Sequence, residues 1–131
     1  MFGCDKIKGG ATMPPGEWKR ITPLLDVRGI VHRKDAALAF TRLAFSQHGS
    51  GKPFGLLIEP EPDNPVDVNA LKVIGWANRI NYHVGYVAAH EAARAAERFP
   101  NVPLAAEFYG VYLGGGGWVD IRFFLSAPQN A

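Results

Sequence analysis

The stretch "EPEPDNPVDVNALKV", residues 59–73, contains an unusual loop that separates two strand-like runs of the chain. Positions 59–67 hold four carboxylates and three prolines, and an apolar run follows at once. Proline fixes its own backbone and lacks an N–H donor, so this part is typical of a loop, whereas the flanking apolar runs are typical of strands. The stretch therefore predicts an acidic loop between a strand at 52–59 and a strand at 69–77.

More strands and two helices are predicted on either side of this loop. Apolar residues at helical spacing predict helices, and short aliphatic or aromatic runs bounded by Gly, Pro or Asn predict strands. The predicted order is strand 23–31, helix 34–49, strands 52–59, 69–77 and 81–88, helix 90–99, and strands 104–113 and 118–125. This order, β-α-β-β-β-α-β-β, favours a mainly β fold with two inserted helices, in the form of a small, partly open barrel.

The first of these helices has the clearer signals. Its apolar stripe consists of Ala36, Phe40, Leu43 and Ala44. Asp35 near the start and Gly49 at the end suit the two helix termini.

Length and composition predict one domain with short ends. Of the 131 residues, 1–22 are expected to form a flexible leader, 23–126 the domain and 127–131 a tail. The net charge is only +2, so no broad basic surface is expected. Cys4 is the single cysteine and has no partner for a disulfide, which fits a reducing compartment. No secretory signal or membrane-spanning run is visible, so the expected location is the cytoplasm.

The acidic loop does not have the pattern of a metal site. Counted from Asp63 or from Asp67, neither register places Gly at the sixth position and Glu at the twelfth, as a calcium loop requires. A purely structural role explains the same residues, because Asn64, Asp67 and Asn69 can each bond nearby backbone and shape a turn. No metal is expected here.

The sequence also lacks the other motifs that are typical of enzymes and cofactor sites. The "GGGG" run at 114–117 lies between two strands and lacks a following Lys-Ser/Thr, so it predicts a flexible hairpin tip rather than a phosphate loop. The four histidines have no zinc-site spacing, and no serine lies in a nucleophile elbow. We therefore expect no catalytic residue and no cofactor.

Three motifs nevertheless resemble a known family. The pattern E-P-x-N-P-x-D-x-N-A-L-x-V runs from Glu61 to Val73, "HVGYV" follows at 83–87, and "GIVH" lies at 29–32. Together they resemble the HIRAN domain, best known as the N-terminal module of helicase-like transcription factor and related repair ATPases and also present in many bacterial proteins. The resemblance covers roughly residues 24–125.

The resemblance implies a modified OB-like small barrel that binds single-stranded DNA without catalysis and has a pocket for a free 3′-hydroxyl end. A carboxylate accepts a hydrogen bond from a hydroxyl and repels a terminal phosphate. Asp67 is then the natural acceptor, and Asn64 can hold the loop or the terminal nucleotide. The implied partners are single-stranded DNA or DNA 3′ ends and, in addition, a repair helicase or nuclease.

Some positions depart from the family pattern. Val66 stands where the best-studied members have an aromatic residue that stacks on the terminal base, and Ala88 and Ala89 stand where they have basic residues. Each lost stacking platform removes about 1–3 kcal/mol per base. The implied site residues are His32, Arg33 and Lys34 at the end of the first strand, Asn64, Val66 and Asp67 in the loop, Tyr86 for stacking, and Tyr112 or Trp118 near the last hairpin. The alternative is a protein-interaction or adaptor module on the same barrel, with a decayed DNA groove.

Overall fold

The computed structural model describes residues 5–131 of the chain, so Cys4 lies outside the described residues. The strands are β1 (Asp5–Lys8), β2 (Trp18–Arg20), β3 (Leu25–Asp26), β4 (Phe54–Pro60), β5 (Leu71–Ala77), β6 (Ile80–Tyr86), β7 (Ala105–Leu113) and β8 (Val119–Pro128). The helices are a short 3-10 turn (Ile30–His32), α1 (Lys34–Gly49) and α2 (Ala89–Arg98).

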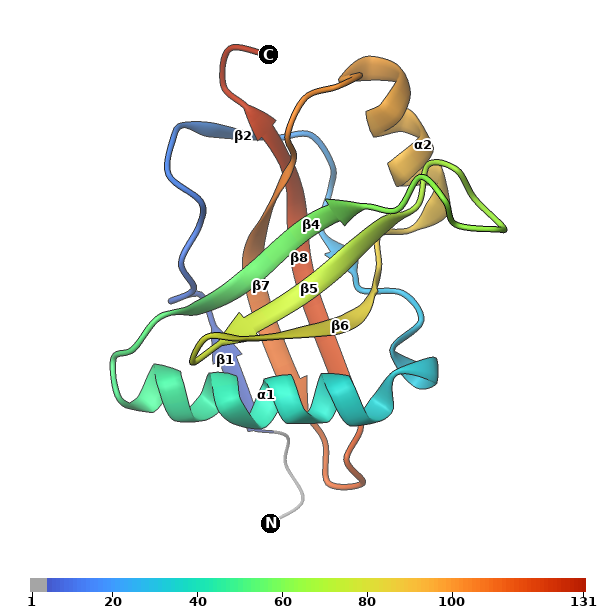
Figure 1. Cartoon of the computed structure of the whole chain (residues 1–131). Helices are drawn as coiled ribbons and strands as arrows, with labels where there is room; N and C mark the ends of the chain where they lie inside the picture. The colour runs from blue at the N-terminus through green and yellow to red at the C-terminus, as the bar shows by residue number, and fades with distance from the viewer. Residues whose placement is uncertain (1–4) are drawn as a thin grey trace.

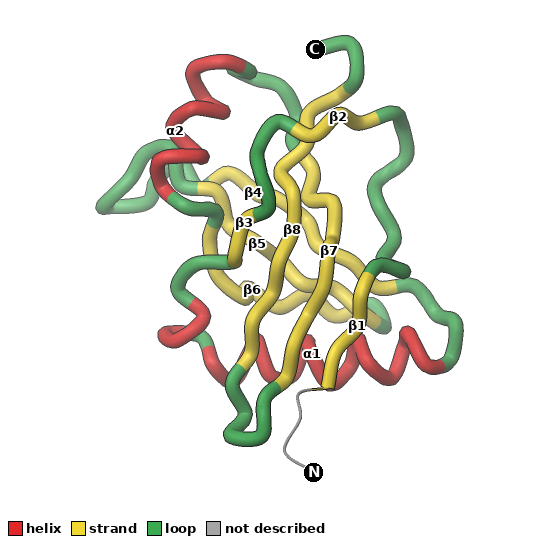
Figure 2. The backbone as a smooth tube through the Cα atoms, turned by 180° about the vertical axis from the view of Figure 1, so that it is seen from behind, coloured by secondary structure: helices red, strands yellow, loops and turns green. Residues whose placement is uncertain are grey.

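The strands form one open antiparallel sheet. Its order is β2-β8-β7-β4-β5-β6, with β1 also paired to β7 and β3 also paired to β8. The prediction of a mainly β fold with two inserted helices is confirmed, but the predicted modified OB-like small barrel is not, because the eight strands form an open sheet. Where β4 meets β7, the pairing is reduced to Leu57 opposite Ala105. There the sheet turns, and the β4–β5 hairpin crosses over β7 and β8 (Figures 1 and 2).

The core lies between these crossing layers. On β8, Ile121, Phe123 and Leu125 are fully buried at alternate positions, as the period of a half-buried strand requires. Figure 1 shows α1 along one end of the sheet and α2 at the other. The Phe40 ring of α1 packs so closely on β5 that a Cβ at Gly75 would lie 2.6 Å from it. Gly75 is therefore required by packing.

Both helices lie close to their predicted positions. The bounds of α1 agree with the prediction. Its buried face is Ala37, Phe40, Thr41, Ala44 and Gln47, so Phe40 and Ala44 of the predicted stripe are buried, whereas Ala36 and Leu43 are only partly buried. α2 begins one residue earlier than predicted and ends one residue earlier. Its end comes before Pro100, as expected from the restriction that proline places on the preceding residue.

The prediction of a loose N-terminal segment is wrong for residues 5–8 and 18–20, which form β1 and β2. β1 pairs with β7 and β2 pairs with β8, and Ile7 enters the core with 3% of its surface exposed. The glycines and prolines between the two strands give this segment the local sequence pattern of a loop, so the two strands were not predicted. Pairing with strands about a hundred positions later is what stabilises them.

The predicted strand at 23–31 is also much shorter in the structure. Only Leu25–Asp26 pairs with β8, and Gly29 adopts a left-handed conformation with φ of 80°. A left-handed residue ends an extended strand, and the chain continues as the 3-10 turn at Ile30–His32. This bend carries the basic residues of this region to the start of α1.

Candidate nucleic-acid interface

The acidic loop between β4 and β5 is shaped by its own side chains. The Asn64 Oδ1 atom accepts the backbone N–H groups of Val66 (2.9 Å) and Asp67 (3.0 Å). The Asp67 Oδ1 atom accepts the N–H of Asn69 at 2.9 Å. These are the turn-forming bonds expected for Asn and Asp. They hold Val66 at the tip of the loop, where 93% of its surface is exposed.

Glu61 ties this loop to the rest of the sheet. Its Oε1 atom accepts the Asn64 amide N–H at 2.6 Å and the Tyr86 hydroxyl at 2.9 Å. Its Oε2 atom lies 3.8 Å from the Lys72 Nζ, which lies 3.2 Å from a Glu59 oxygen. The pKa of Glu61 lies below its ordinary value. The largest cause is the hydrogen bond from Asn64, the next is the hydrogen bond from Tyr86, and the charge of Lys72 adds to them. Glu61 is therefore ionised at neutral pH.

Tyr86 connects the acidic loop to the basic residues that follow β3. Its backbone exchanges two hydrogen bonds of 2.8 Å with Arg28, the isolated bridge between this segment and β6. The Arg33 guanidinium lies over the Tyr86 ring, 5.7 Å from its centroid. The His83 ring meets the Tyr86 ring edge-on, with centroids 4.8 Å apart. One aromatic ring thus contacts both a carboxylate and a basic residue.

His83 is a neutral neighbour of this ring. Burial first, and then the charge of Arg33, lower the pKa of His83 below its ordinary value. Its Nε2 atom lies 2.9 Å from the carbonyl oxygen of Gly85, so the nitrogen donates that bond. The bond fixes the imidazole ring beside Tyr86.

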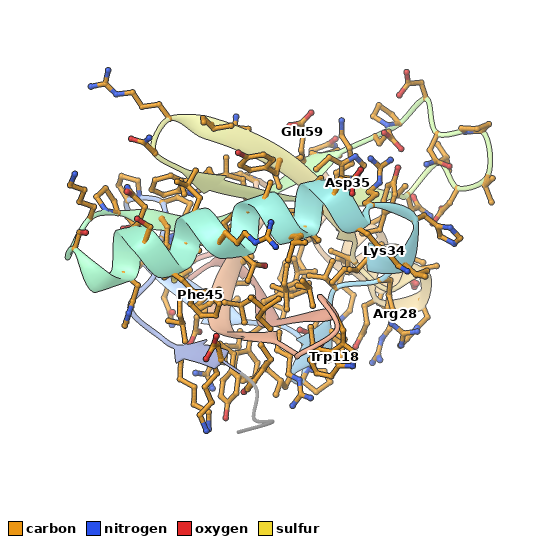
Figure 3. The ribbon with its side chains drawn as sticks, turned by 90° about the horizontal axis from the view of Figure 1, so that it is seen from below. Arg28, Lys34, Asp35, Phe45, Glu59 and Trp118 are labelled. Carbon is orange, nitrogen blue, oxygen red and sulfur yellow. The ribbon has the colours of Figure 1, made fainter. Side chains whose placement is uncertain are left out.

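The basic segment 28–34 lies next to the tip of the last hairpin. Figure 3 shows Arg28 and Lys34 on the same side of the molecule as Trp118, beside the start of α1. A shallow hollow of about 340 Å³ lies here, lined by Ile30, Val31, Lys34, Gly116, Gly117, Trp118 and Val119. Trp118 is 58% exposed, so its ring is available for stacking.

Tyr112, the other aromatic candidate of the hairpin, lies in a different cluster. The Arg122 guanidinium packs over its ring at 5.1 Å from the centroid. Arg122 also pairs with Asp120 at 2.9 Å and with Asp26 at 3.3 Å. Of the two alternatives, only Trp118 lies beside the basic segment.

The predicted site residues are therefore brought together in part. Asn64 and Asp67 lie in the loop with Val66, and Arg33 contacts Tyr86, whereas His32 and Lys34 are exposed near the start of α1. Sequence reasoning missed Glu61, whose bond to Tyr86 joins residues 25 positions apart. Its place at the start of the E-P-x-N-P pattern was the one signal available.

A separate hollow of about 450 Å³ lies between α2 and the β4–β5 hairpin. None of its lining residues is charged, and it is lined mainly by Ile58, Val68, Leu71, Ala92, Ala96 and Phe99, together with the 100–104 segment. This second surface is apolar, unlike the surface around Tyr86.

No group of three or more His, Cys, Asp or Glu side chains within residues 5–131 is placed to hold a metal ion. In the same range, no helix combines the length and the apolar character needed to cross a membrane. No match to this chain was found among protein-family models, curated proteins or solved structures.

Proposed function

We propose that this chain is a non-catalytic module that binds single-stranded DNA and recognises a 3′-hydroxyl end. One observation carries the proposal. Tyr86 contacts the acidic loop through Glu61 and the basic segment through Arg28 and Arg33. An aromatic platform between carboxylates and cations has the chemistry needed for the end of a strand, where a base, a hydroxyl and a phosphate meet.

Each part of such an end has a suitable partner. The Asp67 carboxylate uses Oδ1 for the Asn69 N–H, and its second oxygen can accept the 3′-hydroxyl. Arg33, Lys34 and His32 can contact phosphates, and Tyr86 can stack on a base. Trp118 lies farther along the same basic surface and can stack on a base upstream of the end.

The architecture that we propose for this function is a modified OB-like barrel left open on one side. The Arg28–Tyr86 bridge supports this architecture. It links the segment after β3, near one end of the sheet, to β6 at the other end. The proposed DNA surface runs along the region where the segment after β3 and β6 meet through this single bridge.

Fluorescence anisotropy with short labelled oligonucleotides tests the proposal. A strand with a 3′-hydroxyl should bind more tightly than the same strand with a 3′-phosphate or as a closed circle. Because few cations lie on the surface, the salt dependence should be shallow, with about 2–3 phosphates neutralised at a slope of about −0.7 each. Equal affinity for all three DNAs would reject end recognition.

The apolar hollow beside α2 favours a second candidate, a protein-interaction or adaptor module. Its uncharged lining suits an apolar segment of a partner protein, for example a repair helicase or nuclease. Selection from a displayed peptide library, with Ala96→Glu as the counter-selected variant, tests this candidate. Apolar peptides that bind only the wild-type protein would favour it, and a selection without enrichment would reject it.

A further inference from the structure

We infer that Glu61 positions the proposed 3′-end site and is a second carboxylate, beside Asp67, that disfavours a 3′-phosphate. The inference rests on the proposed function and assigns a specificity role to a residue outside the predicted set. Glu61 follows directly after β4, and its N–H donates to the Ala70 carbonyl at 2.9 Å. Its backbone thus closes the neck of the acidic loop, and this fixes the origin of its side chain.

One oxygen of the Glu61 carboxylate bonds two residues that are candidate contacts for DNA. Oε1 accepts both the Asn64 amide and the Tyr86 hydroxyl. Hydrogen bonds to an ionised acceptor are stronger than those between neutral groups. Two such bonds set the orientation of the Tyr86 ring and of the Asn64 side chain at the same time, before any ligand binds.

The other carboxylate oxygen keeps capacity for a ligand. Oε2 lies 3.8 Å from the Lys72 Nζ, which is longer than a hydrogen bond between nitrogen and oxygen. The Glu61 side chain is 23% exposed, so part of the carboxylate group's surroundings is open to solvent. A sugar hydroxyl next to a base stacked on Tyr86 can donate to Oε2. A phosphate at the same position brings a second negative charge and is repelled.

Glu59 provides a matched control. It lies two residues earlier, in β4, and pairs with the same Lys72, at 3.2 Å. Within residues 5–131, the Glu59 side chain pairs with Lys72 and bonds neither Tyr86 nor Asn64. Substituting Glu59 therefore removes an equal charge from the same region and leaves the platform intact.

The test compares wild type with Glu61→Gln, Glu61→Asp and Glu59→Gln. Each protein is titrated by anisotropy with one thymidine oligonucleotide carrying either a 3′-hydroxyl or a 3′-phosphate. Glu61→Gln should lower the ratio of the two affinities by about tenfold, since a charged acceptor exceeds a neutral one by about that factor. Glu61→Asp should keep most of the ratio but weaken binding to both DNAs, because a shorter side chain keeps the charge and loosens Tyr86 and Asn64. Glu59→Gln should leave the ratio unchanged.

Thermal melting confirms that each variant is folded before the ratio is read. A folded Glu61→Gln variant with the wild-type ratio would overturn the inference and leave the proposed function standing. An equal loss of the ratio in Glu59→Gln would also overturn it, because it would indicate a general charge effect. A wild-type protein that does not distinguish the two DNA ends would remove both the inference and the proposed function.

Discussion

Two connections of the same sheet are built in opposite ways. The β4–β5 loop is held by side chains, with Asn64 bonding two backbone N–H groups and Asp67 a third. The β7–β8 tip is held by backbone alone, through Gly114 N–H to the Trp118 carbonyl at 2.8 Å and Gly117 N–H to the Gly114 carbonyl at 3.0 Å. The first connection needs particular side chains for its shape, and the second needs glycine at Gly117, where φ is 79°.

This difference determines how each connection can carry function. In the β4–β5 loop, the groups that shape the turn are also the groups offered to a ligand, so stability and binding are coupled there. In the β7–β8 tip, the exposed Trp118 ring is offered by a turn whose bonds do not involve that ring. Removing a turn-forming side chain should therefore affect stability and binding together in the loop, whereas in the tip the two should change separately.

The largest expected effect is on stability, from Asn64→Ala. This change leaves two backbone N–H groups without their acceptor and removes a donor from Glu61. We expect a loss of about 2–3 kcal/mol in the free energy of unfolding, measured with urea. The matched change in the tip is Gly116→Ala, where an added Cβ meets open space, so its stability should be nearly unchanged. Equal losses in the two variants would remove the distinction between the connections.

A gain of binding is expected from Val66→Tyr. Val66 is almost fully exposed, and the N–H that it donates to Asn64 is kept in the variant. A tyrosine offers the stacking surface that valine lacks, which should strengthen DNA binding by about 1–3 kcal/mol, or roughly five- to a hundredfold. The measurement is anisotropy on one 3′-hydroxyl oligonucleotide, after circular dichroism has confirmed the fold. A folded variant with no gain would favour the protein-interaction candidate.

A smaller effect is expected from Asp67→Asn, which separates the structural role of this side chain from its charge. The amide oxygen can still accept the Asn69 N–H, so the melting temperature should fall little. The preference for a 3′-hydroxyl over a 3′-phosphate should fall by about two- to fivefold, because the carboxylate proposed to accept the hydroxyl becomes a neutral amide. A large fall in melting temperature with an unchanged preference would show that Asp67 only shapes the turn.

The smallest effect concerns the dependence of stability on pH. The folded-state pKa values of Glu61 and His83 both lie below their ordinary values, so the unfolded chain binds more protons than the folded one in these ranges. Stability should therefore decrease as the pH falls, first below about 6.5 through His83 and then below about 4.3 through Glu61. Urea unfolding at several pH values measures this. Glu61→Gln should reduce the slope of stability against pH in the lower range, to which Glu107 also contributes, and an unchanged slope there would contradict the assignment.

The elements that sequence predicted well are those with a complete local signal. The bounds of α1 follow from a periodic apolar stripe with Asp35 in its first turn. β1 and β2 were missed because each is short, lies near glycine or proline, and is stabilised by strands far along the chain. The strand predicted at 23–31 was too long, because the local sequence does not show that Gly29 adopts a left-handed conformation and ends the extended segment.

The same division applies to the candidate site. The turn bonds of Asn64 and Asp67 are local, so residue types alone predicted them. Glu61 is one of four carboxylates that look alike in the sequence, and only the pairing of β5 with β6 brings Tyr86 to it. The choice between Trp118 and Tyr112 likewise depended on contacts that are distant in the sequence, since Trp118 shares a hollow with Lys34 whereas Tyr112 packs against Arg122.

The pairing of β1 with β7 and of β2 with β8 also bears on how the protein is synthesised. A ribosome adds about 5–20 residues per second, so the roughly 110 residues between β1 and β8 take on the order of ten seconds to make. During this time the two earliest strands lack their partners, and their backbone groups are open to other chains. The sheet is therefore expected to be completed only after β8 has left the ribosome.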